Sequence, residues 1–354
     1  MKIGFLTSGG DCQALNGAMR GVVKGLKANS KEKLQIIGFL KGYKGLVEGK
    51  YKKMTDKDFE DILNLGGTIL GSSRMPFKYI NDPDEKGRNK IECMIENYKK
   101  LELDCLVVLG GNGSHKTANL LSEKGLNVVT LPKTIDNDIY GTDITFGFQS
   151  AVDVATGYID EIRTTAKSHG RVFIVEVMGH KTGWLTLSAG IAGAADIILI
   201  PEIPYDIDKV KKALTEKAKK GSAIIAVAEG IISKEEAGIK KKELKAKRLS
   251  EPVSAAERLY NELKDITNAE MRTSVIGHCQ RGGSPDAYDR VLVSRLGAKA
   301  AELILNKEFG RAVVFVGNQT DSIPLSMAVE QTKFVDPDCS MVNDAKMLGI
   351  CMGD

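Results

Sequence analysis

The sequence predicts an α/β protein built on two doubly wound, mostly parallel sheets, with the active site in the cleft between them. Short apolar runs typical of buried strands alternate along the chain with stretches of helical periodicity, which favours parallel sheets covered by helices. The length of 354 residues exceeds what one ordinary hydrophobic core accommodates, and this favours two sheets. Glycine-rich or polar residues directly follow several of the strands, where ligands bind in open α/β sheets.

Strands are expected where short apolar runs stand between glycine-rich or charged segments. In chain order the predicted strands are residues 2–7, 34–40, 103–109, 126–131, 171–177, 197–200, 223–228, 272–277 and 312–316. Helices are expected where apolar residues recur at helical spacing, as Ile91, Met94, Ile95 and Tyr98 do. The predicted helices are residues 14–27, 90–101, a helix that ends near 123, and residues 146–164, 185–195, 253–265 and 297–305.

The composition excludes several classes of function. Hydrophobic residues make up 42% and charged residues 27% of the chain, as in ordinary globular proteins, and the net charge is only +4. This charge gives no basic face for nucleic acid, and no apolar run is long enough to span a membrane. The lysine-rich stretch 234–248 is interpreted as a solvated helix face or loop, with a polyanion site as the less favoured alternative. The six cysteines show neither CxxC pairs nor zinc spacing, and the N-terminus lacks a signal-peptide pattern, which together predict a cytoplasmic protein.

Two glycine-rich loops each lie between a predicted strand and a predicted helix. Residues 9–11 (GGD) follow the first strand, and residues 110–114 (GGNGS) follow the strand at 103–109. In this arrangement the backbone N–H groups at a helix start can bind a phosphate. Either glycine loop alone could serve packing, but two such loops on one sheet favour phosphate binding. Neither loop has the GxGxxG or Walker A pattern, so a dinucleotide fold or a P-loop enzyme is not expected.

The segment 132–138 (PKTIDND) places two carboxylates, Asp136 and Asp138, directly after the predicted strand at 126–131. In an extended backbone their side chains would point the same way, because strand side chains repeat every second residue. One carboxylate could then accept a proton while the other holds a cation, for which Mg²⁺ is the expected metal. A polar turn with two solvated aspartates is the competing interpretation.

Basic residues complete a pattern typical of phosphoryl transfer. Arg74 ends the segment 66–74 (GGTILGSSR), and together with Lys133 it could stabilise charge on a transferred phosphoryl group. Four further residues could bind a second anion, on the acceptor: Arg171, Arg272, His278 and Arg281. Two anion sites that flank a carboxylate base indicate a phosphorylated acceptor.

Taken together, these motifs resemble the 6-phosphofructokinase family. The similarity covers nearly the whole chain and rests on SGGD, GGTILGSSR, GGNGS, PKTIDND with GTDITFGFQSA, VEVMG, AEG and GHCQRGGSP, in the family's order. It implies phosphorylation of D-fructose 6-phosphate at its 1-hydroxyl by ATP with Mg²⁺, giving fructose 1,6-bisphosphate and ADP in glycolysis. It also implies a homo-oligomer with sites shared between subunits, usually a tetramer, with a dimer as the second possibility.

The resemblance assigns roles to single positions. Asp136 would be the general base, and Thr134, Asp138 and Arg74 would complete the catalytic group, with Asp138 and more weakly Asn112 holding the metal. The donor would contact Gly10, Arg74, Gly111, Asn112, Gly113, Ser114 and Lys133. The sugar phosphate would contact Thr134, Asp136, Arg171, Met178, Gly179, His180, Glu229, Arg272, His278 and Arg281. By the same resemblance, Arg171 and Arg272 would come from the adjacent subunit.

The resemblance also implies two domains. Residues 1–146 plus about 282–311 would bind the ATP donor. Residues 147–281 plus the C-terminal residues 312–354 would bind the sugar phosphate.

The chain departs from the family's pattern at positions that affect the donor and the metal. The family usually has aspartate in place of Asn112 and arginine in place of His180, and both changes remove a charge that would contact metal or phosphate. Family members that use pyrophosphate typically carry aspartate in place of Gly113 and a lysine at the position of Lys133. Gly113 leaves space for the α-phosphate and ribose of a nucleotide, so ATP is favoured over pyrophosphate. A catalytically weak regulatory paralogue and a sedoheptulose 7-phosphate kinase are two further hypotheses that fit the same motifs.

Overall fold

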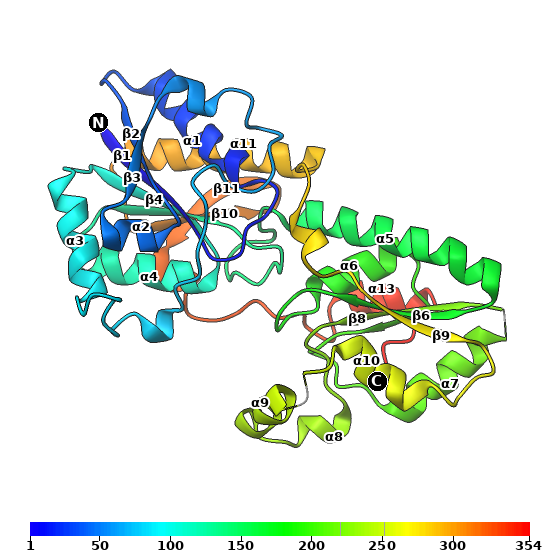
Figure 1. Ribbon diagram of the computed structural model, residues 1–354. Helices are drawn as coiled ribbons and strands as arrows, with labels where there is room; N and C mark the ends of the chain where they lie inside the picture. Colours follow the sequence, from blue (N-terminus) through cyan, green and yellow to red (C-terminus); the bar gives the residue numbers. More distant parts are fainter. Residues whose placement is uncertain (220, 251) are drawn as a thin grey trace. The chain divides into compact units, whose positions relative to one another are not determined.

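The computed structural model describes residues 1–219, 221–250 and 252–354, without the side chain of Lys241. The chain forms two compact units, each built around a sheet (Figure 1). Unit 1 comprises Met1–Ser150 and Arg281–Lys333, and unit 2 comprises Ala151–Gln280 and Phe334–Asp354. The prediction of an α/β fold with two sheets is therefore confirmed.

The sheet of unit 1 is mixed, with a parallel centre and antiparallel edges. Its strand order is β11 (Gln319–Pro324), β10 (Arg311–Val316), β5 (Val128–Pro132), β4 (Cys105–Gly110), β1 (Lys2–Ser8), β2 (Gln35–Phe39) and β3 (Tyr51–Met54). The strands from β10 to β2 pair in parallel, whereas β11 and β3 pair antiparallel to their neighbours. The strand order reverses between β1 and β4, and ligands bind beside such a reversal, at the carboxyl ends of the strands.

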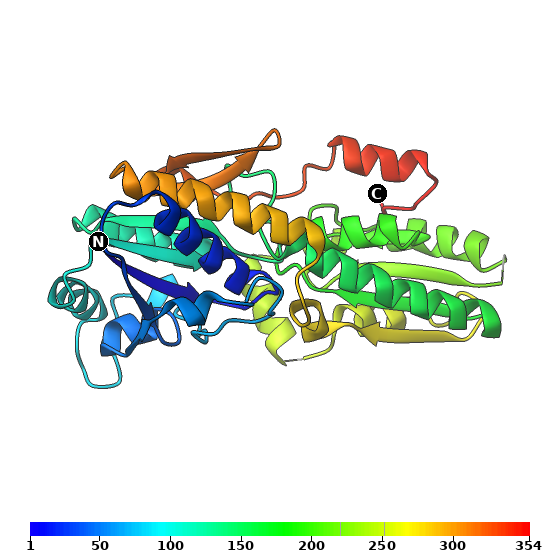
Figure 2. The ribbon, with the colours of Figure 1, turned by 90° about the horizontal axis from the view of Figure 1, so that it is seen from above.

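Helices cover both faces of this sheet, so its central strands are apolar and buried. The helices α1 (Leu15–Asn29) and α11 (Ala287–Leu305) lie side by side on one face, and α3 (Lys90–Lys100) and α4 (Asn112–Glu123) lie on the other (Figures 1 and 2). All residues of β4 are buried. A Cβ atom on Gly21 would lie 2.8 Å from the Val293 carbonyl oxygen, so the close approach of α1 to α11 requires glycine there.

The sheet of unit 2 is parallel, in the order β7 (Ile197–Leu199), β8 (Ala223–Ala228), β6 (Val172–Val177) and β9 (Met271–Val275). The helices α5 (Phe148–His169) and α6 (Trp184–Ala192) lie on one face, and α7 (Ile207–Ala218) and α10 (Ala255–Leu263) lie on the other. Ile225 and Val227 of β8 pack with Leu214 of α7 and Leu259 of α10 in the hydrophobic core between the sheet and these two helices.

The remaining elements are short or peripheral to the sheets. They are α2 (Tyr43–Glu48), α8 (Lys234–Ala237), α9 (Lys241–Ser250), α12 (Leu325–Ala328), α13 (Ser340–Met347) and the 3₁₀ turns Asp56–Phe59, Phe77–Tyr79 and Gly277–Arg281. The described side chains of α9 are mostly exposed, in agreement with the solvated helix face or loop predicted for the lysine-rich stretch. None of the helices in the described parts of the chain has the length and apolar character that crossing a membrane requires.

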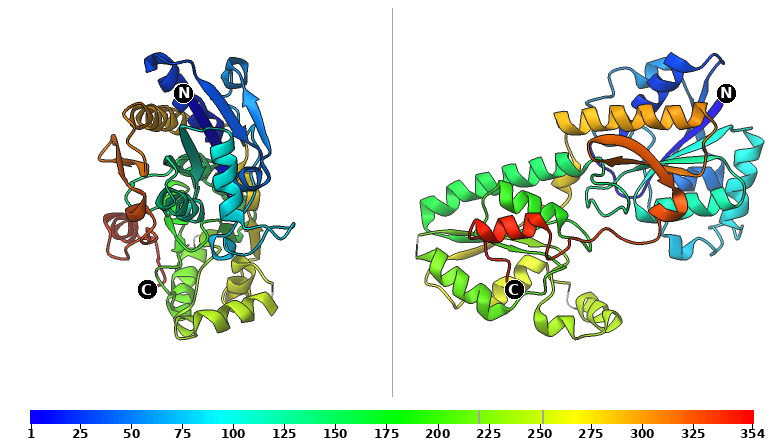
Figure 3. Two further views of the ribbon diagram at one scale, coloured as in Figure 1. Left: turned by 90° about the vertical axis from the view of Figure 1, so that its left-hand side faces the viewer. Right: turned by 180° about the vertical axis from the view of Figure 1, so that it is seen from behind.

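The division into units differs from the predicted domains at three places. Residues 312–333 are predicted in the sugar-phosphate domain, but they belong to unit 1, because β10 pairs with β5 and β11 completes the hairpin (orange in Figure 3). Residues 147–150 and Arg281 also belong to unit 1. The predicted helix at 297–305 begins ten residues earlier, at Ala287, because the Asp286 carboxylate caps its N-terminus by accepting from the Asp289 N–H (2.6 Å).

Candidate active site

The first glycine loop of unit 1 follows β1, and hydrogen bonds to the segment 72–73 fix its conformation. Gly9 has a φ of 89°, a conformation that side chains other than glycine rarely adopt. Its N–H donates to the Ser73 carbonyl (3.1 Å), and its carbonyl accepts from the Ser72 hydroxyl (2.6 Å). These contacts fix the loop beside the segment that ends in Arg74.

Two cations lie against this loop. The Lys133 ammonium donates to the Gly10 carbonyl, and Arg281 Nη1 donates to the Asp11 carbonyl (2.9 Å). A Cβ on Gly10 would lie only 2.8 Å from Arg281 Nη1, so glycine allows the guanidinium to approach. Lys133 is 3% exposed, and burial lowers the pKa of its amine. The loop thus has two basic side chains beside it, which are groups that bind phosphate oxygens.

The second glycine loop forms the N-terminus of α4. Gly111 is the N-cap residue, and its carbonyl accepts from the Ser114 N–H (2.9 Å). The Lys133 N–H donates to the Gly110 carbonyl (3.1 Å), which joins this loop to the end of β5. A Cβ on Gly113 would have no heavy atom within 4 Å among the described residues, apart from its chain neighbours and the nearby backbone of α4. The helix N-terminus therefore offers N–H groups to an anion beside open space at Gly113.

The segment after β5 bends, contrary to the extended backbone considered from the sequence. Asn137 lies between the two aspartates with a φ of 52°, and its Oδ1 accepts from the Thr145 N–H (3.0 Å). The Asp136 N–H donates to the Thr134 hydroxyl (3.0 Å). The left-handed residue is stabilised by its own side chain, since asparagine tolerates this conformation when its amide bonds locally.

Asp138 is joined to the start of α4 through Asn112. Asn112 Nδ2 donates to Asp138 Oδ2 (2.8 Å) and to the Asp138 carbonyl (3.1 Å). The amide nitrogen, and not the oxygen that would ligate a metal, faces Asp138. The Asn112 amide therefore donates to Asp138, whereas a second carboxylate at this position would repel it.

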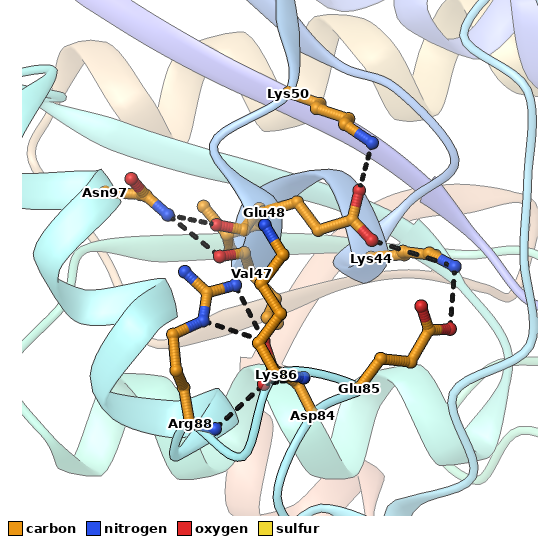
Figure 4. A network of polar contacts seen from close by, with 10 residues as sticks. Lys44, Val47, Glu48, Lys50, Asp84, Glu85, Lys86, Arg88 and Asn97 are labelled. Carbon is orange, nitrogen blue, oxygen red and sulfur yellow. Dashed lines mark hydrogen bonds and ion pairs between the residues drawn. The ribbon is translucent and has the colours of Figure 1, made fainter.

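A cavity of about 480 Å³ lies beside Ser73 and Arg74. Val47, Met75, Pro76 and Tyr79 give it apolar walls. Its rim is a network of charges, in which the Lys44 ammonium pairs with Glu85 (3.2 Å) and Glu48 (3.7 Å), and Arg88 pairs with Asp84 (Figure 4). The volume is within the usual range for sites that bind small molecules.

Unit 2 carries a loop whose conformation depends on one carboxylate. After β6, Gly179 has a φ of 151° and His180 a φ of 53°. Glu229, which follows β8, accepts from the N–H groups of His180 (2.6 Å) and Gly179 (3.3 Å) through Oε1. The buried side chain of Gln280 accepts from the Met178 N–H (3.3 Å) and orders the same loop from the other side. His180 and His278 are not buried.

Arg171 and Arg272 lie away from this loop within unit 2. Arg171 precedes β6 and Met178 follows it, so the six residues of the strand separate them by about 23 Å. Arg272 pairs in register with Phe173, near the same end of the sheet as Arg171. Both guanidinium groups contact Glu270, Arg171 Nε at 2.5 Å. The structure thus divides the predicted substrate-binding residues of unit 2 between opposite ends of its sheet.

The predicted donor and catalytic residues come together in unit 1. Hydrogen bonds link the first loop to Lys133, Lys133 to the second loop, and the second loop to Asp138. The set brought together is Gly10, Arg74, Gly111, Asn112, Gly113, Ser114, Lys133, Thr134, Asp136 and Asp138. Arg281, which is predicted to bind the sugar phosphate, instead contacts the first loop of unit 1. The structure adds Ser72 and Gln280, which lie within two of the motifs but are not among the predicted site residues, and Lys333, which lies in a segment without a motif.

The strand-order reversal, the two glycine loops and the adjoining carboxylates define a doubly wound α/β protein with a site suited to phosphoryl transfer. The chain belongs to the phosphofructokinase family, whose model matches residues 2–304. An ATP-dependent 6-phosphofructokinase of Spirochaeta thermophila is 50% identical over 99% of this chain and 97% of its own length. A pyrophosphate–fructose 6-phosphate 1-phosphotransferase of Amycolatopsis methanolica is 40% identical over 96% of this chain and 97% of its own. The solved phosphofructokinase of Saccharomyces cerevisiae matches with a TM-score of 0.79 at 31% identity, over 93% of this chain and 45% of the yeast chain.

Proposed function

We propose that this protein transfers the terminal phosphoryl group of ATP to the 1-hydroxyl of D-fructose 6-phosphate, giving fructose 1,6-bisphosphate and ADP as a step of glycolysis in the cytoplasm. The observation that carries the proposal is the hydrogen-bonded junction of both glycine loops with the Asp136–Asp138 segment, in a chain of the phosphofructokinase family. In unit 1, the two loops would hold the donor and Asp136 would be the base.

In this reaction the sugar's 1-oxygen attacks the terminal phosphorus, the bond to the oxygen of ADP breaks, and Asp136 accepts the hydroxyl proton. The hydrogen bond from the Asp136 N–H to Thr134 holds the base at the end of β5. Lys133 and Arg281 lie against the first loop, where they would balance charge on the donor phosphates. Arg74 would contact the transferred group from the other side of that loop.

The carboxylate of Asp138 fits Mg²⁺, which takes a few hard oxygen ligands and completes its coordination with phosphate oxygens and water. Asp138 would hold the ion, and Asn112 would orient Asp138 through its amide nitrogen. When bound, Mg²⁺ supplies charge neutralisation on the donor phosphates.

Two observations support ATP as the donor. The first is the open space at Gly113, where an aspartate would stand in pyrophosphate users. The second is the cavity beside Arg74, which has apolar walls for a nucleoside that pyrophosphate lacks. Lys133 is the observation that favours pyrophosphate. Its ammonium, however, is hydrogen-bonded to the Gly10 carbonyl, a contact that can support either donor.

On the sugar side, Glu229 and the loop that contains Met178, Gly179 and His180 would bind the hydroxyls, with His278 near the phosphate. The separation of Arg171 and Arg272 from this loop supports a site completed by a second copy of the chain. We therefore propose a homo-oligomer, a tetramer or a dimer, in which these two arginines bind the 6-phosphate held mainly by the neighbouring subunit.

Subunit complementation is the expected consequence of shared sites. The double variant Arg171→Ala/Arg272→Ala and the variant Asp136→Asn should each be nearly inactive alone. When the two variants are co-expressed in equal amounts, the hybrid oligomers should recover about a quarter of the wild-type rate. In about a quarter of the sites, one subunit supplies an intact Asp136 and the neighbouring subunit supplies both intact arginines. Hybrids no more active than the parents would contradict shared sites.

Turnover with different acceptors tests the proposed function. Initial rates with ATP and Mg²⁺ are measured for fructose 6-phosphate and for sedoheptulose 7-phosphate, and the product is identified by aldolase cleavage. We expect fructose 1,6-bisphosphate as the product and the higher kcat/KM with fructose 6-phosphate. Preference for sedoheptulose 7-phosphate would identify a kinase of that sugar, and turnover no higher than that of Asp136→Ala would identify a regulatory paralogue.

A further inference from the structure

Lys333 joins the segment after α12 to the Asp136–Asp138 segment. Thr332 forms an antiparallel bridge with Ile139, and the Lys333 N–H donates to the Asp138 carbonyl (2.9 Å). Asp138 thus has its carbonyl bonded both to Lys333 and to Asn112 from the start of α4. The backbone of the second aspartate is held from two sides.

The side chain of Lys333 makes a second set of contacts with the same loop. Its ammonium donates to Asn137 Oδ1 (3.0 Å), the Thr142 carbonyl (2.8 Å) and the Asp143 carbonyl (2.9 Å). Burial lowers the pKa of Lys333 to about 8, so the amine is mostly protonated at neutral pH and retains its three donor hydrogens. One ammonium therefore connects Asn137, which lies between the two aspartates, with the turn at residues 142–143.

The contact of Lys333 with Asn137 is relevant to catalysis because of where Asn137 lies. It lies between Asp136 and Asp138, has a φ of 52°, and uses Oδ1 to accept from both Lys333 and the Thr145 N–H. The loop around Asn137 lies outside regular helices and strands, so side-chain hydrogen bonds fix its backbone in place of the backbone hydrogen bonds of a helix or sheet. Loss of the lysine would leave Asn137 Oδ1 and two carbonyls with one partner fewer.

We propose that Lys333 is a positioning residue for phosphoryl transfer, which holds Asn137 and the turn 142–143 so that Asp136 and Asp138 keep their productive geometry. It acts through the loop and does not contact the reacting atoms. The inference rests on the proposed function, in which Asp136 is the base. A base displaced by about 1 Å can lower a rate by about 10²-fold, so a residue outside the site can have a large effect on kcat.

The test compares Lys333→Met with Lys299→Met, which removes a partly buried lysine of α11 that pairs with Glu302. We expect Lys333→Met to lower kcat about 10- to 100-fold while KM for ATP and for fructose 6-phosphate changes less than about threefold. Lys299→Met should retain both constants. Lys333→Cys should behave like Lys333→Met and regain activity after 2-bromoethylamine restores an amine at this position, with treated wild type and Lys299→Cys as controls.

Hydrogen exchange supplies a readout that does not require turnover. Lys333→Met should exchange faster than wild type in residues 134–145, and Lys299→Met should not. A lower melting temperature with unchanged kcat would show that Lys333 has only a structural role, and unchanged exchange in 134–145 would overturn the proposal even if the wild type proved inactive. If the wild type proved inactive but Lys333→Met still exchanged faster than wild type in residues 134–145, the result would count against the proposed function and not against the role of Lys333 in holding the loop.

Discussion

Asp136→Asn is expected to lower kcat by about 10²-fold or more, because it removes the general base while keeping the size of the side chain. The Asp136 N–H would still donate to Thr134, and the contacts of Asn137 with Thr145 would be unchanged, so the loop should keep its shape. Steady-state rates with ATP and fructose 6-phosphate measure the effect, and KM for either substrate should change little.

Asp143→Asn is the matched control for this variant. Asp143 lies in the same loop, is exposed, and accepts from the Gly317 N–H (2.8 Å), a contact that asparagine can keep. It should retain wild-type activity. If Asp136→Asn turned over at the wild-type rate, the assignment of Asp136 as base would be wrong.

Gly113→Asp should lower kcat/KM for ATP by about 10²-fold, because a carboxylate some 4 Å from a nucleotide phosphate is repelled by several kcal/mol at an effective dielectric constant near 20. The protein should fold normally, since a Cβ at this position meets no described heavy atom within 4 Å beyond its neighbours. An acidic residue in the first turn of α4 would also interact favourably with the helix dipole.

Two further substitutions separate the causes of this effect. Gly113→Ala adds only a methyl group and should leave ATP kinetics nearly unchanged. Gly113→Asn adds the volume of aspartate without its charge and should have an intermediate effect. If Gly113→Asp and wild type had equal kcat/KM for ATP, the nucleotide would not pass this glycine, and the cavity beside Arg74 would lose its proposed role.

Much of the donor half of the site follows from local sequence patterns. A buried strand followed by glycine and polar residues marks the carboxyl end of a parallel strand, and this pattern correctly predicts both glycine loops and the Asp136–Asp138 segment at one edge of a sheet. Their proximity then follows from strand order, which the alternation of strands and helices indicates. The edge strands β3 and β11 escape prediction because half or more of their residues are exposed, so they lack a buried run.

Several features depend on contacts that a sequence pattern does not encode. Lys333 contacts Asn137 across 196 positions of the chain, and nothing in its neighbours distinguishes it from a surface lysine. The bend at Asn137 follows from a side-chain contact with Thr145, which is not visible in a strand-like alternation of polar and apolar residues. The membership of residues 312–333 in unit 1 is decided by the pairing of β10 with β5, a long-range interaction.

Donor choice is tested by the initial rate with fructose 6-phosphate and Mg²⁺, with ATP as donor in one arm and pyrophosphate in the other. The open space at Gly113 and the cavity beside Arg74 predict turnover with ATP and none above background with pyrophosphate. Turnover with pyrophosphate alone would contradict the proposed function, and it would show that Lys133 and not Gly113 decides the donor.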